Sequence, residues 1–252
     1  MIIQYASDLH LEFPENLAYF KDNPIKPLGD ILLLAGDIVP LAIMDYFGPF
    51  FDYVSDHFKT TYWIPGNHEY YHSDLATRIG TIHEAIRHNV FLVNNTSVIH
   101  ENTNFIFSTM WSKINPRHAR QIEHAMSDFR LIKYFQNPLT SEHISEIHNE
   151  SIAFLKKELS ANNTIKKVVV THHVPTLSNY PAKYKDSILN EAFGVELSDL
   201  IEFYQPDYWI YGHIHRNFPD FKIGKTTLLT NQLGYVKYGE HKLFQPGISV
   251  LL

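Results

Sequence analysis

The sequence predicts an α/β fold in which short buried strands alternate with helices. Short apolar runs bounded by polar or glycine residues recur along the chain, and stretches with helical spacing separate several of them. Polar clusters follow five of these runs, at the edge where the strands of a mainly parallel sheet would end. With 252 residues, 44% of them hydrophobic, the chain can bury a substantial core, and we expect one domain over residues 1–252.

The first third of the chain shows the order strand, loop, strand, helix, strand, helix. Strands are expected at residues 2–6, 31–35 and 60–64, where apolar residues run together. Residues 41–58 carry apolar side chains at helical spacing, which predicts a helix. Residues 73–88 begin with a serine suited to an N-cap and predict a second helix. This alternation favours parallel strands joined by helical crossovers.

The middle of the chain has a different pattern. Three closely spaced strands are expected at 90–93, 97–100 and 104–108, with asparagine turn signals between them, and they favour an antiparallel meander. Residues 111–134 are aromatic and basic without a clear period, so they could form a lid or a long connection. Residues 141–159 have the spacing of an amphipathic helix capped by Ser141.

The last part of the chain returns to alternation. Four apolar runs predict strands at 167–171, 208–211, 226–230 and 248–252. A long loop is expected over 176–194, a helix over 195–204 and a turn over 231–235. No internal repeat, low-complexity tract or linker interrupts the sequence, which supports the expectation of a single domain.

Composition excludes several kinds of site and partner. There is no cysteine, so disulfide bonds and thiolate ligands are excluded, and any metal must be held by nitrogen and oxygen. The formal charge of −6 argues against nucleic acid as a partner. The start of the chain lacks a basic leader, and no apolar run approaches the roughly 18 residues that span a membrane. We therefore expect a cytoplasmic protein with no membrane partner.

Polar side chains gather directly after five expected strands. The clusters are Asp8 with His10, Asp37, Asn67 with His68, His172 with His173, and His213 with His215. Because the carboxyl ends of parallel strands lie at one edge of a sheet, loops from distant parts of the chain can meet there around a ligand. Imidazole and carboxylate without thiolate suit zinc, iron or manganese. The number of candidate ligands fits two metal ions better than one.

Together these clusters resemble the motifs of the calcineurin-like metallophosphoesterases. The blocks occur in the order of that family: Asp8-Leu9-His10, Gly36-Asp37, Gly66-Asn67-His68-Glu69, His172 and Gly212-His213-Ile214-His215. The resemblance implies a two-sheet α/β sandwich flanked by helices on both outer faces, a four-layer αββα fold. The glycines at 36, 66 and 212 precede ligands, where we expect the chain to turn sharply off a strand.

Carried over residue by residue, the resemblance implies seven metal ligands. Asp8, His10 and His215 would hold one metal, Asn67, His172 and His213 would hold the other, and Asp37 would bridge them. The cofactor would be two divalent or mixed-valence ions of manganese, iron or zinc, sharing a hydroxide that attacks phosphate. His68 matches the family's proposed general acid or phosphate-positioning histidine, and His173 would orient a ligand from outside the metal site.

The second block departs from the protein serine/threonine phosphatases of this family, which continue it as Gly-Asp-x-Val-Asp-Arg-Gly. Here it continues as Gly36-Asp37-Ile38-Val39-Pro40-Leu41-Ala42, without the phosphate-binding arginine. The remaining motifs look more like the small bacterial phosphodiesterase-type members. Arg130 and Arg216 are candidates for a replacement cation, although each could also be structural. Aromatic residues of the irregular stretches could stack a nucleobase or pack locally: Trp111, Tyr134, Tyr180 and Tyr184.

We therefore expect a binuclear-metal-dependent hydrolase of a small, possibly nucleotide-like phosphate ester, in the first place a phosphodiesterase. A phosphomonoesterase or a nuclease of the same family is the alternative enzyme, and the lack of lysine- and arginine-rich tracts counts against the nuclease. The alternative of another class is a non-catalytic protein-binding scaffold with this fold. A decayed metal site should lack ligands, whereas all seven positions here carry a competent side chain.

Overall fold

Two mixed sheets of six strands each form the centre of the computed structural model, which describes residues 1–161, 165–180 and 184–252. The first sheet, in spatial order, contains β14 (Ser249–Leu251), β1 (Ile2–Ala6), β2 (Ile31–Leu34), β3 (Thr60–Trp63), β5 (Val90–Asn94) and β4 (Ile82–Arg87). The second contains β12 (Phe221–Ile223), β13 (Thr226–Leu229), β11 (Tyr208–Ile210), β10 (Lys166–Thr171), β7 (Thr103–Ser108) and β6 (Thr96–His100).

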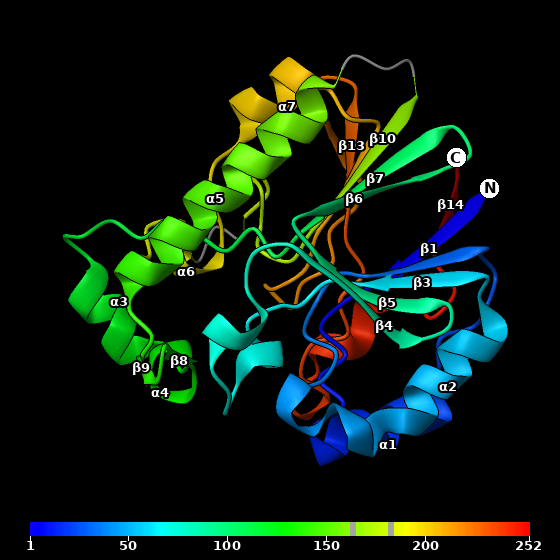
Figure 1. Ribbon diagram of the computed structural model, residues 1–252, viewed down its shortest axis with the longest axis horizontal. Helices are drawn as coiled ribbons and strands as arrows, with labels where there is room; N and C mark the ends of the chain where they lie inside the picture. The colour runs from blue at the N-terminus through cyan, green and yellow to red at the C-terminus, as the bar shows by residue number, and fades with distance from the viewer. Residues whose placement is uncertain (162–164, 181–183) are drawn as a thin grey trace.

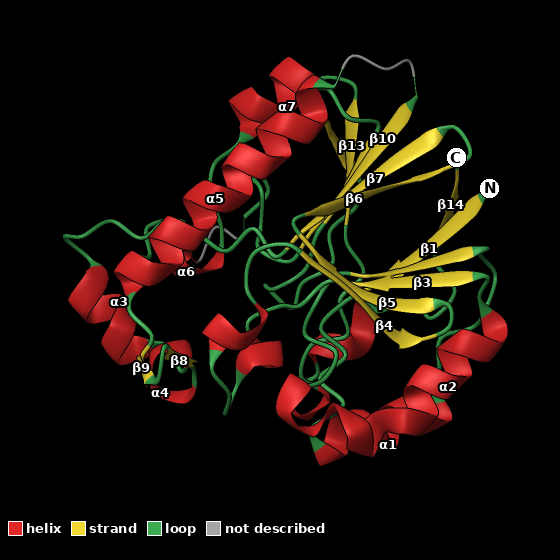
Figure 2. Ribbon diagram, in the orientation of Figure 1, coloured by secondary structure: helices red, strands yellow, loops and turns green. Residues whose placement is uncertain are grey.

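Both sheets are built in the same way. Four parallel strands form the centre of each one, and an antiparallel strand closes each edge. The sheets face each other, with helices on their outer sides (Figures 1 and 2). Helices α1 (Pro14–Asp22) and α2 (Gly48–His57) lie outside the first sheet, and α5 (Ser141–Ser160) and α7 (Ser198–Tyr204) lie outside the second. The expected α/β sandwich with helices on both outer faces is confirmed.

The core follows from the alternation of side chains along the strands. In β2, Leu33 points between the two sheets, whereas Leu32 and Leu34 point outward beneath the helices, as the period of two in a strand requires. Phe51 and Val54 of α2 pack in the same outer cluster as Leu32. Because both faces of the central strands are covered, a central strand can be apolar throughout, as the Ile-Leu-Leu-Leu run of β2 is.

Helix α5 confirms the prediction of a long amphipathic helix, with one correction at its start. The N-cap is Thr140 rather than Ser141, because the Thr140 hydroxyl accepts a hydrogen bond from the backbone N–H of His143. The His143 side chain accepts in return from the backbone of Thr140, which completes a capping box. Buried residues such as Ile144, Leu155 and Leu159 form its inner face.

Two predictions for the first half of the chain are wrong. Residues 73–88 form a short 3₁₀ helix, η3 (Leu75–Arg78), followed by β4, because pairing of β4 with β5 outweighs the helical spacing. The expected meander is also absent from the described residues, since β5 belongs to the first sheet while the antiparallel pair β6 and β7 belongs to the second. The Asn94–Asn95 turn therefore carries the chain from one sheet to the other.

Other segments contain more structure than the sequence pattern indicated. Residues 41–58 divide into η1 (Leu41–Phe47) and α2, where Pro49 lies at the helix start. The irregular stretch 111–134 contains α3 (Ala119–Ala125), α4 (Asp128–Leu131) and β8 (Lys133–Tyr134), which pairs with β9 (Asn137–Pro138). Helix α6 (Asn190–Phe193) ends the expected long loop. No helix within the described parts of the chain is both long and apolar enough to cross a membrane.

Candidate metal centre

The seven residues implied as metal ligands meet at the carboxyl ends of strands from both sheets. Asp8 and His10 follow β1, Asp37 follows β2 and Asn67 follows β3, all in the first sheet; His172 follows β10, and His213 and His215 follow β11, in the second. All are almost entirely buried except His215, which is partly exposed. The site therefore lies where the two sheets converge, and it needs both of them to form.

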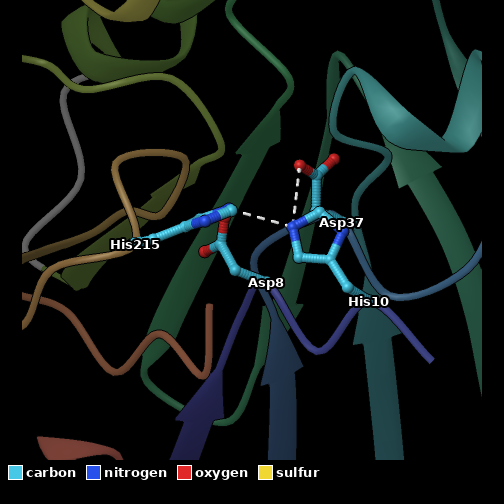
Figure 3. Close-up of side chains that lie close together, drawn as sticks. All are labelled: Asp8, His10, Asp37 and His215. Carbon is cyan, nitrogen blue, oxygen red and sulfur yellow. Dashed lines mark hydrogen bonds and ion pairs between the residues drawn. The ribbon is translucent and has the colours of Figure 1, made fainter. Parts of the chain in front are cut away.

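One group of ligand atoms comes from Asp8, His10, Asp37 and His215 (Figure 3), and these atoms all lie within 4.8 Å of one another. Nε2 of His10 is 2.9 Å from Nε2 of His215 and 3.7 Å from Oδ2 of Asp37. Nε2 of His215 is 3.4 Å from Oδ1 of Asp8. Three loops from both sheets thus place two nitrogens and two carboxylates around one point.

A second group comes from Asp37, His172 and His213, again with ligand atoms within 4.8 Å. Nε2 of His172 is 3.1 Å from Nδ1 of His213 and 3.4 Å from Oδ2 of Asp37. The amide oxygen of Asn67 joins this group, at 3.1 Å from the same His172 nitrogen. Asp37 belongs to both groups, as a bridging ligand must.

The second ring nitrogen of each histidine is held by an acceptor outside the groups. These contacts join His10 to Glu12 (3.2 Å), His215 to Glu240 (2.9 Å), His172 to the Ala35 carbonyl (2.8 Å) and His213 to the Ala192 carbonyl (3.4 Å). An acceptor there takes a ring proton, so the other nitrogen can present its lone pair inward. The chain therefore orients four imidazoles as ligands.

The electrostatics of the two groups favour positive charge between the paired nitrogens. Burial opposes protonation of His215, but Asp8 and Glu240 outweigh it and raise its pKa to about 10, while burial and His68 lower the pKa of His10. These shifts favour a proton on His215, whose Nε2 lies 2.9 Å from Nε2 of His10. A metal cation would replace such a proton, as metal binding generally does, so the residues present fit a metal.

The second group shows the same pattern. Burial of His172 is outweighed by Asp37 and Asp8, which raise its pKa to about 9, whereas burial and the neighbouring histidines hold the pKa of His213 well below its usual range. Burial alone would raise the pKa of Asp37, but His172, His68 and His10 hold it well below its usual range. Asp37 is therefore ionised between the two groups, where a bridging carboxylate is needed.

Five of the seven candidate ligands have left-handed backbone conformations that are rare for residues other than glycine. Their φ angles are 55° at Asp8, 47° at His10, 56° at Asp37, 80° at His213 and 49° at His215. Such conformations are unfavourable and persist where surrounding structure enforces them, often at functional sites. Here they turn each side chain back from the strand end toward the shared centre.

The three glycines before the ligands serve two different purposes. Gly36 has φ of 88°, which agrees with the expected sharp turn. Gly66 and Gly212 lack a positive φ, and close packing explains the need for glycine at these two positions. A Cβ atom at Gly66 would lie 2.1 Å from Oδ1 of Asp37, and one at Gly212 would lie 2.6 Å from Oδ2 of Asp8. Both glycines make room for carboxylates of the candidate ligands.

Glu69, the last residue of the Gly66-Asn67-His68-Glu69 block, fixes the loops after β2 and β3. Its buried carboxylate accepts hydrogen bonds from the backbone N–H groups of Asp37, Ile38 and Gly66 at 2.6–2.8 Å, and from Nε1 of Trp63 at 3.0 Å. It thereby sets the position of Asp37 relative to Asn67. The motif contained this residue, but its position in the sequence did not reveal this structural role.

His68 lies in η2 (His68–Tyr70), beside the two groups that share Asp37, and forms a third cluster of possible ligand atoms with His10 and Glu12. Its backbone N–H donates to Oδ1 of Asp37 at 2.9 Å. Its Nδ1 is 3.1 Å from Oε1 of Glu12, and its Nε2 is 3.3 Å from the hydroxyl of Tyr235. Burial opposes protonation of the His68 ring, but Asp37 and Glu12 outweigh it and raise the pKa.

His173 is buried behind the second group. Its Nδ1 lies 3.2 Å from the Thr109 carbonyl, and its ring centroid is 4.3 Å from that of His213. It therefore packs against one candidate ligand, in keeping with the supporting role that was expected of it. Tyr235 was expected only as part of a turn, but its ring lies 4.4 Å from that of His215 and 4.8 Å from that of His10.

A cavity of about 1020 Å³ is lined by His68 and by four of the candidate ligands, Asp37, Asn67, His213 and His215. Arg216, Tyr180 and Tyr184 line it, as do Ser127 and its neighbours from the irregular stretch, which thus forms one wall. Arg130 does not line it within the described residues; its guanidinium donates to the His124 carbonyl and the Ser127 hydroxyl. The other two aromatic candidates contact the hydrophobic core: Trp111 is buried in it, and the partly buried Tyr134 packs against it.

Comparisons with known proteins agree with this geometry. Residues 3–217 match the family model described as calcineurin-like phosphoesterase. The uncharacterized protein L509 of Acanthamoeba polyphaga mimivirus is 31% identical, in an alignment that covers 93% of this chain and 91% of the viral protein. The phosphopantetheinyl hydrolase PptH from Mycobacterium tuberculosis is similar in structure, with a TM-score of 0.74, 16% identity, and coverage of 99% of this chain and 95% of PptH. Because PptH is only 16% identical to this chain, the similarity to PptH shows a shared fold and nothing further.

Proposed function

Because this chain belongs to the calcineurin-like phosphoesterase family and is a metal-dependent phosphoesterase, we propose that its substrate is a phosphodiester. The main support for a diester is the cavity beside the candidate ligands. It has a volume of about 1020 Å³ and few cationic side chains in its lining. Apart from histidines, its basic lining residues in the described chain are Arg216 and Lys242. A diester carries one negative charge and two substituents, so it needs more room and less compensating charge than a monoester.

The proposed metal ligands are the seven residues described above. Asp8, His10 and His215 would hold one ion, Asn67, His172 and His213 would hold the other, and Asp37 would serve both. Support comes from the two groups of ligand atoms that share Asp37 and from the acceptors that orient the histidines. Nitrogen and oxygen ligands of this kind suit manganese, iron or zinc. Two such ions would lower the pKa of water and neutralise charge on the phosphoryl group.

The chain's own residues supply binding and proton transfer. The cavity walls, which include the rings of Tyr180, Phe193 and Phe218, would hold the two ester substituents. His68, which lines the same cavity, would donate a proton from Nε2 to the leaving oxygen. The same proposal treats residues 1–252 as one domain, because β1 and β14, from opposite ends of the chain, pair in one sheet.

The test combines metal content with a choice between two esters. Elemental analysis should find two metal ions per chain, and the manganese-reconstituted protein should hydrolyse bis(p-nitrophenyl) phosphate faster than p-nitrophenyl phosphate. Faster cleavage of the monoester would replace the proposal with a phosphomonoesterase. The structural likeness to PptH suggests a phosphopantetheinyl ester as a further test compound, and single-stranded DNA tests the nuclease alternative. Absence of metal and turnover would favour the scaffold.

A further inference from the structure

Glu12 lies between a metal-ligand histidine and the proposed proton donor. Its Oε1 atom is 3.2 Å from Nδ1 of His10 and 3.1 Å from Nδ1 of His68. The side chain is 10% exposed, and its second oxygen, Oε2, is buried without a hydrogen-bond partner in the described structure. One carboxylate oxygen is therefore shared by two imidazoles whose ring centroids are 4.4 Å apart.

This contact determines which nitrogen of each ring faces the site. A carboxylate only accepts hydrogen bonds, so each ring donates to Glu12 through a proton on Nδ1. Nε2 of His10 then points toward Asp37 and His215. Nε2 of His68 points instead toward the hydroxyl of Tyr235, and both of these residues line the cavity. The carboxylate thus orients a metal ligand and a proton donor together.

Two further contacts hold the His68 ring in this orientation. The ring of Tyr71 stacks on it with a centroid separation of 4.0 Å and an interplanar angle of 27°. The backbone N–H of His68 donates a hydrogen bond to Oδ1 of Asp37. This bond couples the segment that bears the His68 ring to a proposed metal ligand. Among the described residues, Glu12 is the acceptor that selects the tautomer of the ring, whereas Tyr71 restricts its plane.

We propose that Glu12 is a positioning residue that holds Nε2 of His68 toward the leaving oxygen of the ester. The inference rests on the proposed function. When the ester bond from phosphorus to the leaving oxygen breaks, the proton on Nε2 of His68 moves to that oxygen, and a water oxygen becomes bonded to phosphorus. Glu12 keeps its negative charge and its hydrogen bond to Nδ1 throughout. The proton released by the water restores Nε2 for the next turnover.

The leaving group provides a readout that a purely structural role would not affect. A p-nitrophenolate leaves readily without protonation, whereas phenolate depends more on a proton donor. At saturating metal, Glu12→Leu should lower kcat/KM for diphenyl phosphate by about 10- to 100-fold, within the range for general acid catalysis. The loss for bis(p-nitrophenyl) phosphate should be several-fold smaller. Glu12→Gln, whose amide oxygen can still accept from His68, should restore part of the activity on diphenyl phosphate.

Two controls separate the role of Glu12 from other effects. Glu15→Leu changes an exposed glutamate at the start of α1 and should affect neither substrate. In a His68→Asn background, Glu12→Leu should no longer alter the ratio of the two activities, because the donor is gone. Equal losses on both substrates, accompanied by loss of metal, would mean that Glu12 acts through His10 alone and would overturn the proposal.

A magnetic resonance experiment tests the contact without relying on turnover. In the zinc-loaded protein, the Nδ1 proton of His68, assigned by its loss in His68→Asn, should exchange slowly with water. It should exchange much faster in Glu12→Leu. An unchanged exchange rate would contradict the proposed hydrogen bond even if no substrate were found. Conversely, slow exchange in a protein that hydrolyses neither diester would contradict the proposed function while leaving the contact intact.

Discussion

The side-chain amide of Asn67 donates a hydrogen bond from Nδ2 to Oδ1 of Asp128 at 2.9 Å. This bond fixes the amide so that its oxygen, rather than its nitrogen, faces His172. The hydroxyl of Tyr71 donates to the same Asp128 oxygen at 2.8 Å, and Asp128 itself is buried. An asparagine can ligate a metal only through its oxygen, so Asp128 determines whether Asn67 can serve as a ligand.

We predict that Asp128→Ala weakens the metal site that contains Asn67. Without the acceptor, the amide can rotate, and metal affinity should fall by about 10- to 100-fold, as is typical when a residue that orients a ligand is lost. Titration with metal, followed by elemental analysis, should show one tightly bound ion and one weakened ion. Tyr71→Phe, which removes the other hydrogen bond to Asp128, should leave two ions bound. Equal affinity in Asp128→Ala and the unmodified protein would contradict the role of Asp128.

Asp128 is also an example of a site residue that could not be predicted from the sequence. The candidate ligands follow strand ends in short motifs, so the sequence alone was enough to propose them. The residues that orient them come from other parts of the chain: Asp128 from α4, Glu240 from η6 (Glu240–Leu243) and Tyr235 from the loop after β13. Arg130 is a candidate from the sequence, yet in the structure its neighbour Asp128 contacts Asn67, while the Arg130 guanidinium donates to the His124 carbonyl. No local pattern marks a residue whose partner is about 60 positions away.

The fold was predictable to the extent that local sequence determines it. The strands of the two parallel centres contain short apolar segments, and their expected bounds agree with the observed ones within a few residues. Residues 73–88 have helical spacing, yet β4 forms there because Glu84 and its neighbours pair with β5 along the sheet edge. That pairing is a tertiary effect, which spacing within one segment does not reveal. Likewise, the division of β5 and β6 between two sheets depends on packing across the whole molecule.

We predict that Asp37→Asn abolishes turnover and weakens both metal sites. Oδ2 of Asp37 lies 3.4 Å from Nε2 of His172 and 3.7 Å from Nε2 of His10, so its charge serves both groups. Removing that charge leaves each ion with fewer anionic ligands. Elemental analysis and turnover of bis(p-nitrophenyl) phosphate provide the measurement. Asp45→Asn, at an exposed position in η1, is the control and should retain two ions and full activity. Retained activity in Asp37→Asn would rule out the bridging assignment.

We predict that His68→Ala retains both metal ions but slows hydrolysis by about 10²- to 10⁴-fold on a diester with a poor leaving group. The reason is that His68 belongs to neither of the groups that share Asp37, although it lies in the same cavity. Steady-state kinetics with diphenyl phosphate, together with metal analysis, measure both effects. His72→Ala, an exposed histidine on the same loop, should behave as the unmodified protein. Loss of metal from His68→Ala would show that His68 is a ligand or supports one.

We predict that Gly66→Ala disrupts the metal centre even though alanine suits the backbone. The added Cβ atom would lie 2.1 Å from Oδ1 of Asp37 and 2.7 Å from the His172 ring, so the bridging carboxylate must move. Metal content and turnover should both fall sharply. The matched substitution is Gly48→Ala, where the nearest atom to an added Cβ is 3.5 Å away, an ordinary contact. Similar metal content in the two variants would show that Asp37 can shift without loss of the site.

We predict that Asn16→Ala destabilises the whole fold more than an ordinary asparagine substitution does. The buried Nδ2 of Asn16 donates to the carbonyls of Leu9 and Gly234 at 2.9 and 2.8 Å, and its Oδ1 accepts from the backbone N–H of Val236 at 3.1 Å. Through these bonds, Asn16 connects the loop that carries Asp8 with the loop that carries Tyr235. The two loops are more than 200 residues apart in the chain.

Alanine would leave two carbonyls and one N–H without partners in a buried environment. We therefore expect the free energy of unfolding to fall by about 2–4 kcal/mol. Urea denaturation of the metal-free protein measures the change without a contribution from metal binding. The control is Asn23→Ala, because Asn23 makes a single local bond from Nδ2 to the Tyr19 carbonyl at the end of α1, and its loss should cost about 1 kcal/mol or less. If both variants unfolded at the same urea concentration, the link between the first and last loops would not stabilise the fold, and the position of Tyr235 would have to depend on the contacts of its own segment.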